Sequence, residues 1–549
     1  MSAAYEPDAA FPILTDAQMD RLRALAEVEE VVVGEVLYAA GDLDYDFIVI
    51  ESGEVEIVRT ASPNSPEEVI VPHGGGRFLG ELNMLTGQAV YLTARVSEDA
   101  RVRRVSPERF RRFMSEDTEL SDVILRAFMA RREILRTGAA ARSVEVLGSR
   151  TSPEALALRT WAARREVPHI WIEVESPEGE GLLSALDAGV EDLPLVVTPT
   201  AVLRRATPGG LSENLGLSFR VLSGHHYDLV VVGGGPAGLA AAVYGASEGL
   251  ETVVFDEVAA GGQAASSSRI ENYLGFPSGL AGAQLASLAI VQAEKFGARI
   301  TSPCVAASLQ VVDGHLVVTL SDGTEVPTRA VIVASGAHYR TLEVERWSEF
   351  EGAGIHYSAT DLEAKACTGS SIVVIGGANS AGQAALFLAS RAAAVRLVIR
   401  GGDIFAGMSS YLADRILADT RIEVRSGTEV VALGGGSYLS TVTLADRASG
   451  NQEEVACQGL FCFIGAVPAS DWLEGVALDT DGFVLTDHDV PEESAEPFTL
   501  LGRRPLPFET SIPGVFAAGD IRHGSMKRVA AAVGEGASAV SSVHRAIGI

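Results

Sequence analysis

A glycine-rich turn between an apolar run and an alanine-rich segment limits the fold of this chain more than any other part of its sequence. Residues 229–232 are all apolar, as expected for a parallel strand buried on both faces, and Gly233-Gly234-Gly235-Pro236-Ala237-Gly238 follows directly. In this spacing Gly233 permits a tight turn, Gly235 lets the backbone approach a pyrophosphate, and Gly238 lets the next helix pack on the strand. The start of that helix, with Pro236 and Ala237, offers unpaired N–H groups to phosphates. The segment therefore predicts a dinucleotide site.

Two further features extend this prediction. Residues 252–255 read as the next strand, and Asp256 or Glu257 at its end is placed to accept a hydrogen bond from a ribose hydroxyl. A second strand, turn and helix begins at residues 372–375 and continues as Gly376-Gly377-Ala378-Asn379-Ser380-Ala381. Two such units indicate two nucleotide sites. The second pattern is weaker, because Ala378 adds a methyl group where the pyrophosphate approaches.

Charge and composition exclude several other classes of protein. The chain has 549 residues with 43 basic and 72 acidic side chains, and its net charge of −29 repels phosphate backbones, so nucleic acid is not an expected partner. No signal peptide pattern and no apolar run of the ~18 residues needed to cross a membrane are visible. The four cysteines contain no CxxC pair and are too scattered for a disulphide framework. We expect a cytoplasmic, globular protein of several domains, with no metal site.

The residues before the first glycine turn form two further blocks. From about residue 12 to 140, segments at 37–39, 47–51, 55–59 and 68–71 predict strands, with one turn at Ser52-Gly53, and 106–113 and 120–135 predict helices. From about 143 to 215, strands at 144–147, 169–174 and 195–198 alternate with helices at 152–164 and near 181–188. The first of these helices has Ser152 as its predicted N-cap and Pro153 as its first residue.

From about residue 225 onward the chain resembles the thioredoxin reductase family of flavoproteins. The resemblance is carried by the glycine turn, GGQ at 261–263, IENYLGFP at 270–277, VASGA at 333–337 and PGVFAAGD at 513–520. It implies bound FAD, a homodimer, and a nicotinamide domain inserted within the FAD-binding domain. Besides the glycine turn, the residues that it implies for FAD are Gly262, Gln263, Asn272, Gly336, Gly519, Asp520, Lys527, Arg528, Val529 and Ala530.

The same resemblance assigns the second glycine turn to NAD(P)H. The implied binding residues are Gly376, Gly377, Asn379, Ser380 and Ala381. Family members select NADPH through arginines after the following strand, and here that strand ends in Arg400, with no acidic residue before Asp403. An arginine suits a 2′-phosphate, whereas an acidic residue would select the free hydroxyl. We therefore predict NADPH, with NADH as the alternative.

The expected dithiol is missing. Thioredoxin reductases carry a CATC segment whose thiols take electrons from the flavin, and the equivalent positions here are Ser358 and Asp361, which cannot form a disulphide. Cys367 lies nearby in sequence, and we expect it to be a buried structural thiol. Ser358 and Asp361 are the candidate catalytic positions: Asp361 is either a proton donor beside the flavin or a solvated loop acid.

The first block resembles a cyclic-nucleotide-binding domain of the catabolite-activator type, through its β-roll spacing and FLGEL at 78–82. The resemblance gives Glu81 the ribose hydroxyl and places Thr93 in the phosphate-binding segment. Leu92 occupies the position of the arginine that should neutralise the phosphate, and Arg95, three residues later, should point to the opposite face of the strand. We expect a β-roll that serves dimerisation or regulation, with cAMP or cGMP binding as the alternative.

The second block is similar to a thioredoxin or glutaredoxin fold, which places a cis-proline where this chain has Leu193-Pro194. Its active-site position, Arg150-Thr151-Ser152-Pro153, holds no cysteine. The predicted fold is therefore multidomain. It comprises a cyclic-nucleotide-binding-like β-roll at 1–142, a thioredoxin-like α/β domain at 143–224, and two Rossmann-like three-layer α/β domains, one for FAD at 225–343 and 469–549 and one for NAD(P)H at 344–468.

These features predict a FAD-dependent NAD(P)H oxidoreductase whose electron acceptor, a small molecule or a redox protein, the sequence does not identify. Two alternatives stay open. One is a sensor or scaffold that binds FAD with little turnover, and the other is a disulphide reductase that works through the thiols of a partner.

Overall fold

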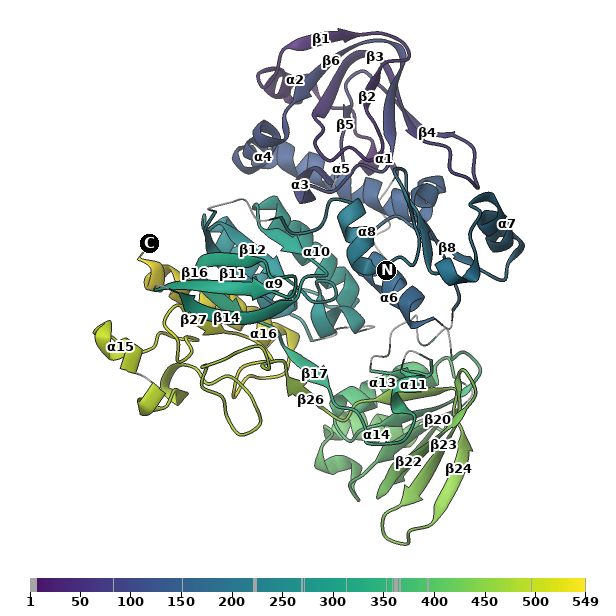
Figure 1. Cartoon of the computed structure of the whole chain (residues 1–549), viewed down its shortest axis with the longest axis vertical. Coiled ribbons are helices and arrows are strands. Elements are labelled where there is room, and N and C mark those ends of the chain that lie inside the picture. The colour runs from purple at the N-terminus through teal and green to yellow at the C-terminus, as the bar shows by residue number, and fades with distance from the viewer. Residues whose placement is uncertain are drawn as a thin grey trace.

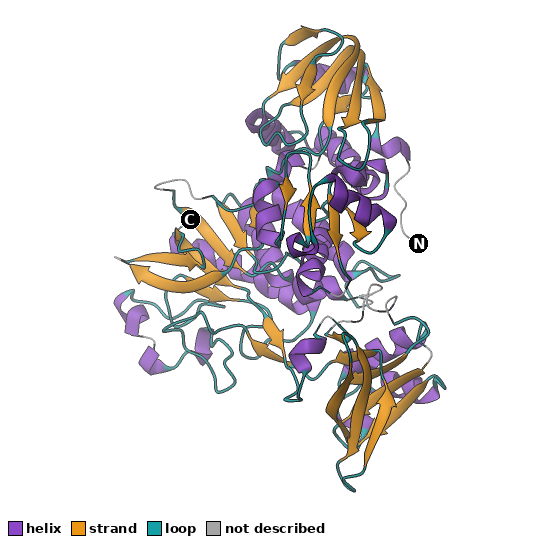
Figure 2. Cartoon of the chain, turned by 45° about the vertical axis from the view of Figure 1, so that its right-hand side comes forward, coloured by secondary structure: helices purple, strands orange, loops and turns teal. Residues whose placement is uncertain are grey.

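The computed structural model describes residues 7–81, 83–150, 152–220, 225–267, 270, 272–312, 314–351, 353–357, 359, 364, 367–392, 394–494 and 496–548. A β-roll lies at one end, two α/β parts lie in the centre, and another α/β part lies at the far end, where two strands connect it to the rest (Figure 1). Helices gather in the centre, whereas strands dominate both ends (Figure 2).

The N-terminal roll is a sheet in the order β1-β6-β3-β4, with β2 paired to β6 and β5 paired to β3. Its strands are β1 (Val28–Val31), β2 (Val36–Tyr38), β3 (Phe47–Arg59), β4 (Glu68–Gly74), β5 (Phe78–Leu79) and β6 (Thr93–Val105). Its helices are α1 (Pro7–Ala10), α2 (Asp16–Arg23), α3 (Asn83–Thr86), α4 (Pro107–Glu116) and α5 (Thr118–Thr137). Phe47, Phe78, Phe110 and Phe128 pack in the core with ring centroids 4.6 to 6.4 Å apart, which ties α4 and α5 to the sheet.

One predicted turn in this roll is wrong. The strands predicted at 47–51 and 55–59 form the single strand β3, which runs through Ser52-Gly53. Gly53 has a φ of +83° and lies at a register shift between β3 and β6. A Cβ at this position would lie 2.3 Å from the carbonyl oxygen of Asp99, so the glycine allows close contact with β6 at a bulge and makes no turn.

The middle domain is a sheet in the order β10-β9-β7-β8, with β7 and β8 parallel and the other pairs antiparallel. Its elements are β7 (Glu145–Gly148), α6 (Pro153–Arg164), β8 (Ile170–Glu173), α7 (Pro177–Ala185), β9 (Leu195–Val197), β10 (Val202–Leu203) and α8 (Pro208–Asn214). The Ser152 hydroxyl accepts a hydrogen bond from the N–H of Ala155 at 3.2 Å, which confirms the predicted cap of α6. The Leu193-Pro194 bond is cis, as the resemblance implied.

The first βαβ domain carries the first glycine turn between β11 and α9. Its sheet runs β13-β12-β11-β16-β15-β14, and β27 also pairs with β16. Strands β13, β12, β11, β16 and β27 pair in parallel, and β14 and β15 add antiparallel pairs. The elements are β11 (Tyr227–Val232), α9 (Pro236–Ser247), β12 (Thr252–Phe255), α10 (Gly282–Lys295), β13 (Arg299–Thr301), β14 (Ala306–Val312), β15 (His315–Leu320), β16 (Glu325–Val333), α15 (Glu496–Leu500), β27 (Val515–Ala517) and α16 (Val529–Ile547).

The second βαβ domain carries the second glycine turn between β19 and α13. Its parallel sheet runs β18-β25-β19-β20-β21, next to an antiparallel sheet β22-β23-β24. The elements are α11 (Trp347–Phe350), β18 (Ile355–His356), β19 (Ser371–Ile375), α13 (Asn379–Ala389), β20 (Ala394–Ile399), α14 (Ser410–Ala418), β21 (Ile422–Ser426), β22 (Thr428–Gly435), β23 (Leu439–Asp446), β24 (Gln452–Ala456) and β25 (Gly459–Cys462). The antiparallel pair β17 (Ala337–Tyr339) and β26 (Ala466–Pro468) joins this domain to the first βαβ domain.

Direct hydrogen bonds join the parts of the molecule. The indole N–H of Trp161 on α6 donates to the carbonyl oxygen of Ser302 at 3.2 Å, and the Ser212 hydroxyl donates to the same oxygen at 3.3 Å, so the middle domain is held on the first βαβ domain.

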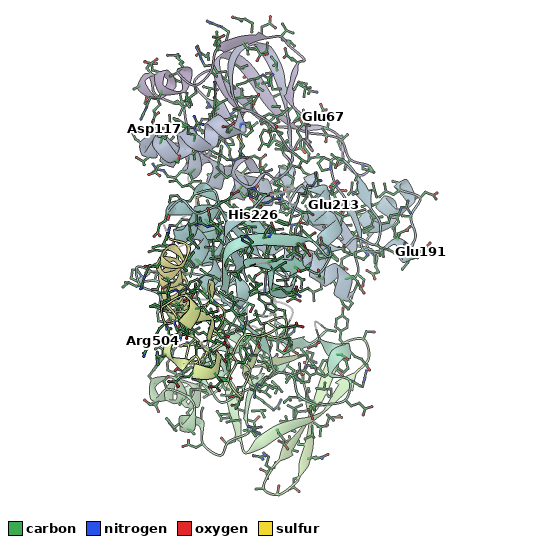
Figure 3. All side chains as sticks on the ribbon, turned by 60° about the vertical axis from the view of Figure 1, so that its left-hand side comes forward. Glu67, Asp117, Glu191, Glu213, His226 and Arg504 are labelled. Atoms are coloured by element: carbon green, nitrogen blue, oxygen red, sulfur yellow. The ribbon has the colours of Figure 1, made fainter. Side chains whose placement is uncertain are left out.

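Acidic side chains such as Glu67, Glu191 and Glu213 project from the outer surface (Figure 3). Among the described residues, no helix has the length and apolar character of a membrane span.

Candidate active site

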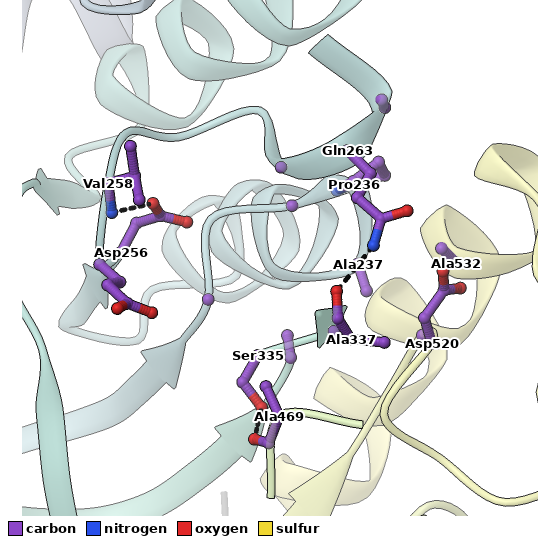
Figure 4. A pocket seen from close by; sticks show the side chains of 18 of the residues that line it. Pro236, Ala237, Asp256, Val258, Gln263, Ser335, Ala337, Ala469, Asp520 and Ala532 are labelled. Carbon is purple, nitrogen blue, oxygen red and sulfur yellow. Dashed lines mark hydrogen bonds between the residues drawn. The ribbon is translucent and has the colours of Figure 1, made fainter. Parts of the chain in front are cut away.

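A cavity of about 690 Å³ lies between the two βαβ domains, and both glycine turns contribute to its wall. Gly233 and Gly235 come from the turn between β11 and α9, while Ser380 and Gln383 come from the first turns of α13. Both helices therefore begin at the same cavity. Its volume lies within the range usual for cofactor sites in proteins. Figure 4 shows the part of the cavity next to α9 and α16.

Two positions of the first glycine turn leave no room for a side chain. A Cβ at Gly233 would lie 2.2 Å from the carbonyl oxygen of Ala334, and one at Gly238 would lie 1.8 Å from that of Gly233. Gly262, in the GGQ segment, has a φ of +53°, and its Cβ would lie 2.9 Å from the Cα of Gly235. The backbone N–H groups at the start of α9 are thus open to a ligand, which is the arrangement that a pyrophosphate requires.

The end of β12 lies at the same wall. The Asp256 carboxylate accepts hydrogen bonds from the N–H of Gly234 at 2.8 Å and from that of Val258 at 3.0 Å, so it fastens the glycine turn to the loop after β12 (Figure 4). Glu257 is exposed and lines the cavity beside it. Cys304 also lines this end, and burial raises the pKa of its thiol to about 12.

At the other end, backbone segments from distant parts of the chain are held together by side chains. The Gln263 amide donates to the carbonyl oxygen of Ala337 at 2.7 Å, and the Ser335 hydroxyl donates to that of Ala469 at 2.8 Å (Figure 4). Gly336 lies between them in the wall. Asn272, which the resemblance assigned to the flavin, is exposed and is not among the residues that line the cavity.

The C-terminal segment supplies the remaining predicted residues. Gly519, Asp520, Lys527, Arg528 and Val529 line the cavity, whereas Ala530 on α16 is exposed and does not line it. Burial raises the pKa of Asp520, and the positive charge of Lys527 acts against that shift. The Lys527 ammonium donates to the carbonyl oxygen of Asp520 and lies 4.1 Å from the centre of the Phe483 ring.

Glu535 on α16 is a supporting residue that the sequence patterns missed. Its carboxylate accepts hydrogen bonds from the N–H of Gly519 at 2.8 Å and from the guanidinium of Arg522 at 2.8 Å. These bonds fix the Gly519-Asp520 turn against the helix. No local motif marks this residue, because its partners lie 13 and 16 positions away.

A pair of tyrosines bridges the two βαβ domains at the cavity, and sequence reasoning missed it too. Tyr339 on β17 and Tyr357, next to the expected dithiol segment, both line the cavity, with ring centroids 5.2 Å apart and planes within 5°. The Trp347 indole donates to the Tyr357 hydroxyl at 2.9 Å, and that hydroxyl donates to Glu351. Burial raises the pKa of Tyr339 to about 12, and a nearby Arg164 acts in the opposite direction.

Of the residues predicted at the second glycine turn, Ser380 lines the cavity. Gly376 has a φ of +142°, and its Cβ would lie 2.3 Å from the carbonyl oxygen of Phe463, so this position also requires glycine. Gly377 lies beside the end of β20, since its Cβ would be 3.2 Å from Ile399, the residue before Arg400. Gly376, Gly377, Asn379, Ala381 and Arg400 do not line the cavity, and Asn379 instead accepts a hydrogen bond from the N–H of Ser409 at 2.8 Å.

The two candidate catalytic positions, Ser358 and Asp361, lie outside the described residues. Their neighbours Tyr357 and Ala359 line the cavity. Cys367 is buried, as predicted. Burial also raises the thiol pKa of Cys457 and of Cys462 to about 12, so both remain protonated near neutral pH.

A second cavity, of only about 50 Å³, lies in the N-terminal roll and is lined by Glu81 and Leu92. Phe11 and Arg131 also line it. The Arg131 guanidinium donates to the carbonyl oxygens of Ala10 at 2.8 Å, Gly80 at 2.6 Å and Phe78 at 3.0 Å. This buried charge is thus already engaged by the protein's own backbone.

The other residues of the expected phosphate segment point elsewhere. Thr93 does not line the small cavity, and its hydroxyl accepts a hydrogen bond from the N–H of Ala40 at 3.0 Å. Arg95 forms ion pairs with Glu56 and Glu67 away from the cavity, as its displacement by three residues predicted.

The large cavity fits FAD by the observations above: a backbone cradle that only glycine permits, an open helix N-terminus, and a Gly519-Asp520 turn held in the wall by Glu535. Among the described residues no cluster of three or more His, Cys, Asp or Glu side chains could hold a metal ion.

Comparisons with known proteins agree with this geometry. Residues 227–536 match the family described as Pyridine nucleotide-disulphide oxidoreductase, and residues 28–117 match that described as Cyclic nucleotide-binding domain. Thioredoxin reductase from Treponema pallidum (strain Nichols) is 33% identical over 313 residues, which are 57% of this chain and 94% of that protein. NADPH-dependent thioredoxin reductase 3 from Arabidopsis thaliana is 33% identical over 326 residues, which are 58% of each chain.

Among solved structures, T. acidophilum thioredoxin reductase is similar with a TM-score of 0.51 and 28% identity, over 58% of this chain and 98% of that one. The match to the pyridine nucleotide-disulphide oxidoreductases spans more than half of the chain and contains both glycine turns. The chain therefore belongs to the pyridine nucleotide-disulphide oxidoreductase family, as a FAD-dependent oxidoreductase related to thioredoxin reductases.

Proposed function

We propose that this enzyme takes electrons from NADPH into FAD and passes them to an acceptor outside the chain without a redox-active CxxC pair. The observation that carries the proposal is the shared cavity, which Gly233 and Gly235 of the first glycine turn and Ser380 and Gln383 at the start of α13 border together. A nicotinamide bound at α13 and a flavin bound at α9 would meet there. FAD supplies the hydride and electron chemistry when it is bound.

The residues proposed to hold FAD are those of the first glycine turn and of the C-terminal wall. The start of α9 faces the pyrophosphate, Glu257 is placed for the adenosine ribose, and Gly519-Asp520 faces the ribityl chain. The start of α16 at Val529 directs its positive dipole end toward the flavin ring. Lys527 donates to the carbonyl oxygen of Asp520, and its positive charge acts against the rise of the pKa of the Asp520 carboxyl group.

We assign NADPH to the second site because of the side chains at the end of β20. Arg400 follows this strand directly and is exposed next to the glycine turn, where a 2′-phosphate would lie. The first acidic residue, Asp403, accepts a hydrogen bond from the N–H of Phe405 at 2.9 Å, so its carboxylate caps its own turn. No acidic residue stands between the end of this strand and Asp403 in the sequence.

The cysteines support a route that uses no thiol of this chain. None of the four is spaced as CxxC. Cys457 donates to the carbonyl oxygen of Gly459 at 3.3 Å, and Cys462 to that of Arg340 at 3.6 Å. Cys304 borders the cavity at the end next to Asp256, and its raised pKa makes it a poor nucleophile.

Rapid mixing with reduced nucleotides without oxygen tests the proposal. We expect NADPH to bleach the flavin absorbance within seconds and NADH to do so more slowly. Arg400→Gln should lower the rate with NADPH relative to NADH about tenfold, since one charged contact to phosphate is lost. Flavin that neither nucleotide reduces would contradict the proposal and favour a sensor or scaffold.

The relatives favour one second candidate, a disulphide reductase that acts through thiols of a partner. It rests on the 33% identity to proteins named thioredoxin reductase. NADPH oxidation in the presence of oxidised thioredoxin separates the two. Consumption that requires thioredoxin and persists after all four cysteines are changed to serine would support a partner's thiols as the acceptor.

A further inference from the structure

The wall of the flavin cavity contains one residue from the middle domain. Arg164, the last residue of α6, lines the cavity together with residues of the two βαβ domains. It is half-buried. The middle domain thus does more than precede the enzyme in the sequence, because one of its charged side chains reaches the space where the cofactor binds.

The position of Arg164 is fixed by the docking of its helix. Trp161 lies one turn earlier on the same face of α6, is fully buried, and donates to the carbonyl oxygen of Ser302 at 3.2 Å. Since residues three apart share a helix face, this bond brings Arg164 toward the first βαβ domain as well. The domain contact therefore places the last turn of α6, which carries Arg164, beside the first βαβ domain.

Arg164 lies near Tyr339 in the wall of the cavity. The two charged groups that act on Tyr339 are Arg164 and Asp520, so Arg164 lies near the Tyr339 and Tyr357 stack and the Gly519-Asp520 turn.

We propose that Arg164 is a residue of the flavin site, contributed by the middle domain, whose positive charge favours the reduced state of bound FAD. Reduction moves a hydride, a proton with two electrons, from the nicotinamide to the flavin, so that the flavin gains one negative charge and the nicotinamide one positive charge. A guanidinium in a partly buried site stabilises that negative charge. The proposal rests on FAD binding in this cavity and is independent of the acceptor.

The midpoint potential of bound FAD is the test, measured against reference dyes without oxygen. In Arg164→Gln the equilibrium constant for reduction should fall roughly tenfold, which corresponds to a potential lower by about 30 mV for a two-electron couple. Arg164→Lys keeps the charge and should stay within about twofold of the unmodified protein. Arg150→Gln is the matched control, because Arg150 belongs to the same domain and is exposed with its partner Glu173 outside the cavity.

A second readout separates charge from docking. FAD affinity and the unfolding midpoint are measured for each variant, so that a loss of docking would lower both in Arg164→Gln and Arg164→Lys alike. A potential that is the same in Arg164→Gln as in the unmodified protein would overturn the proposal. Equal potentials in Arg164→Gln and Arg164→Lys would overturn it as well.

Discussion

The flavin cavity and the cavity of the N-terminal roll differ in what occupies their space. In the first, glycines at 233, 238 and 262 let backbone segments approach closely, and about 690 Å³ stays open between the domains. In the second, Leu92, Phe11 and Arg131 leave about 50 Å³, and the charged group that lies there is bound by main-chain carbonyls. Both regions match known nucleotide-binding families, yet one site is open and the other is filled.

The difference teaches that a family match places a site but its side chains decide whether a ligand fits. Glu81 remains in the N-terminal cavity, where it is buried and its pKa is raised by that burial while Arg132 and Arg131 act against the shift. Leu92 stands at the position of the expected arginine, so this position offers no positive charge to a cyclic phosphate. We therefore expect the roll to keep the packing of its family without binding a cyclic phosphate.

The largest effect is expected where the open cavity depends on close helix contact. A Cβ at Gly536 on α16 would lie 2.0 Å from the carbonyl oxygen of Ala237 on α9, so Gly536→Ala must push apart the two helices that frame the cavity. We expect FAD affinity to fall by about 1,000-fold or more. Gly534→Ala on the same helix meets no atom within 4 Å and should be neutral or slightly stabilising. Fluorescence titration of apoprotein with FAD measures both, and similar affinities would contradict the packing argument.

For the filled cavity, we expect the loss of its buried guanidinium to lower the stability of the roll. Arg131→Met leaves the carbonyls of Ala10, Phe78 and Gly80 without their buried donor, and we expect the N-terminal roll to lose about 4 kcal/mol of unfolding free energy. FAD content should not change. Arg126→Met, on the exposed face of the same helix, serves as control. Urea denaturation followed by domain-resolved proteolysis gives the midpoints, and equal stability of the two variants would show that Arg131 is not structural.

We expect the free energy of unfolding to depend on pH through a buried carboxyl group between the two regions. Glu294 on α10 is buried near Arg165 and Arg132, and burial raises its pKa from 4.5 to about 7. The carboxyl group of Glu294 therefore binds a proton more tightly in the folded protein than in the unfolded chain. As the pH rises from about 4.5 to 7, the protein loses the free energy of unfolding that this difference contributes. At pH 8 the free energy of unfolding of Glu294→Gln should exceed that of the unmodified protein by an amount on the order of 3 kcal/mol, because the glutamine has no buried charge. At pH 4.5 the two proteins should differ little.

The matched control for that experiment is Glu180→Gln, on the exposed side of α7. Denaturation curves at a series of pH values compare the three proteins. If the free energy of unfolding depends on pH in the same way in Glu294→Gln and in the unmodified protein, Glu294 is not the source of the pH dependence.

The smallest expected effect is the response of the N-terminal roll to cyclic nucleotides. With the cavity filled, millimolar cAMP or cGMP should leave the unfolding midpoint unchanged and release no heat in calorimetry. A ligand that did bind, at about 100 times its dissociation constant, would raise the free energy of unfolding by about 2.7 kcal/mol. Micromolar binding would break the comparison between the two cavities.

Local sequence signals predicted the elements that depend on local chemistry. The strand, glycine turn and helix at 229–238 and the Ser152 cap of α6 are present. The cis bond at Leu193-Pro194, which the resemblance to a thioredoxin-like fold implied, is present as well. Gly53 was misread as a turn, since a glycine with positive φ serves either a turn or a bulge and the choice depends on β6, some 45 residues later.

The missed residues of the site share one property. Glu535, Tyr339, Tyr357 and Arg164 act through contacts that no local motif marks, such as the bond between Glu535 and Gly519 across 16 positions, and each is of a type common on any surface or in any core. Sequence periodicity says which face of an element is buried and not against which partner. The composition of the flavin site from three parts of the chain therefore required the fold.

An anaerobic titration with NADPH, with flavin absorbance and thiol titre followed together, tests the proposed route most directly. A chain whose redox centre is FAD alone takes up about one equivalent of NADPH for complete bleaching and exposes no new thiols, because a flavin accepts a pair of electrons and no disulphide follows it. Uptake of about two equivalents together with a rise of two thiols per chain would contradict the account, because it would reveal an electron-accepting disulphide in this enzyme.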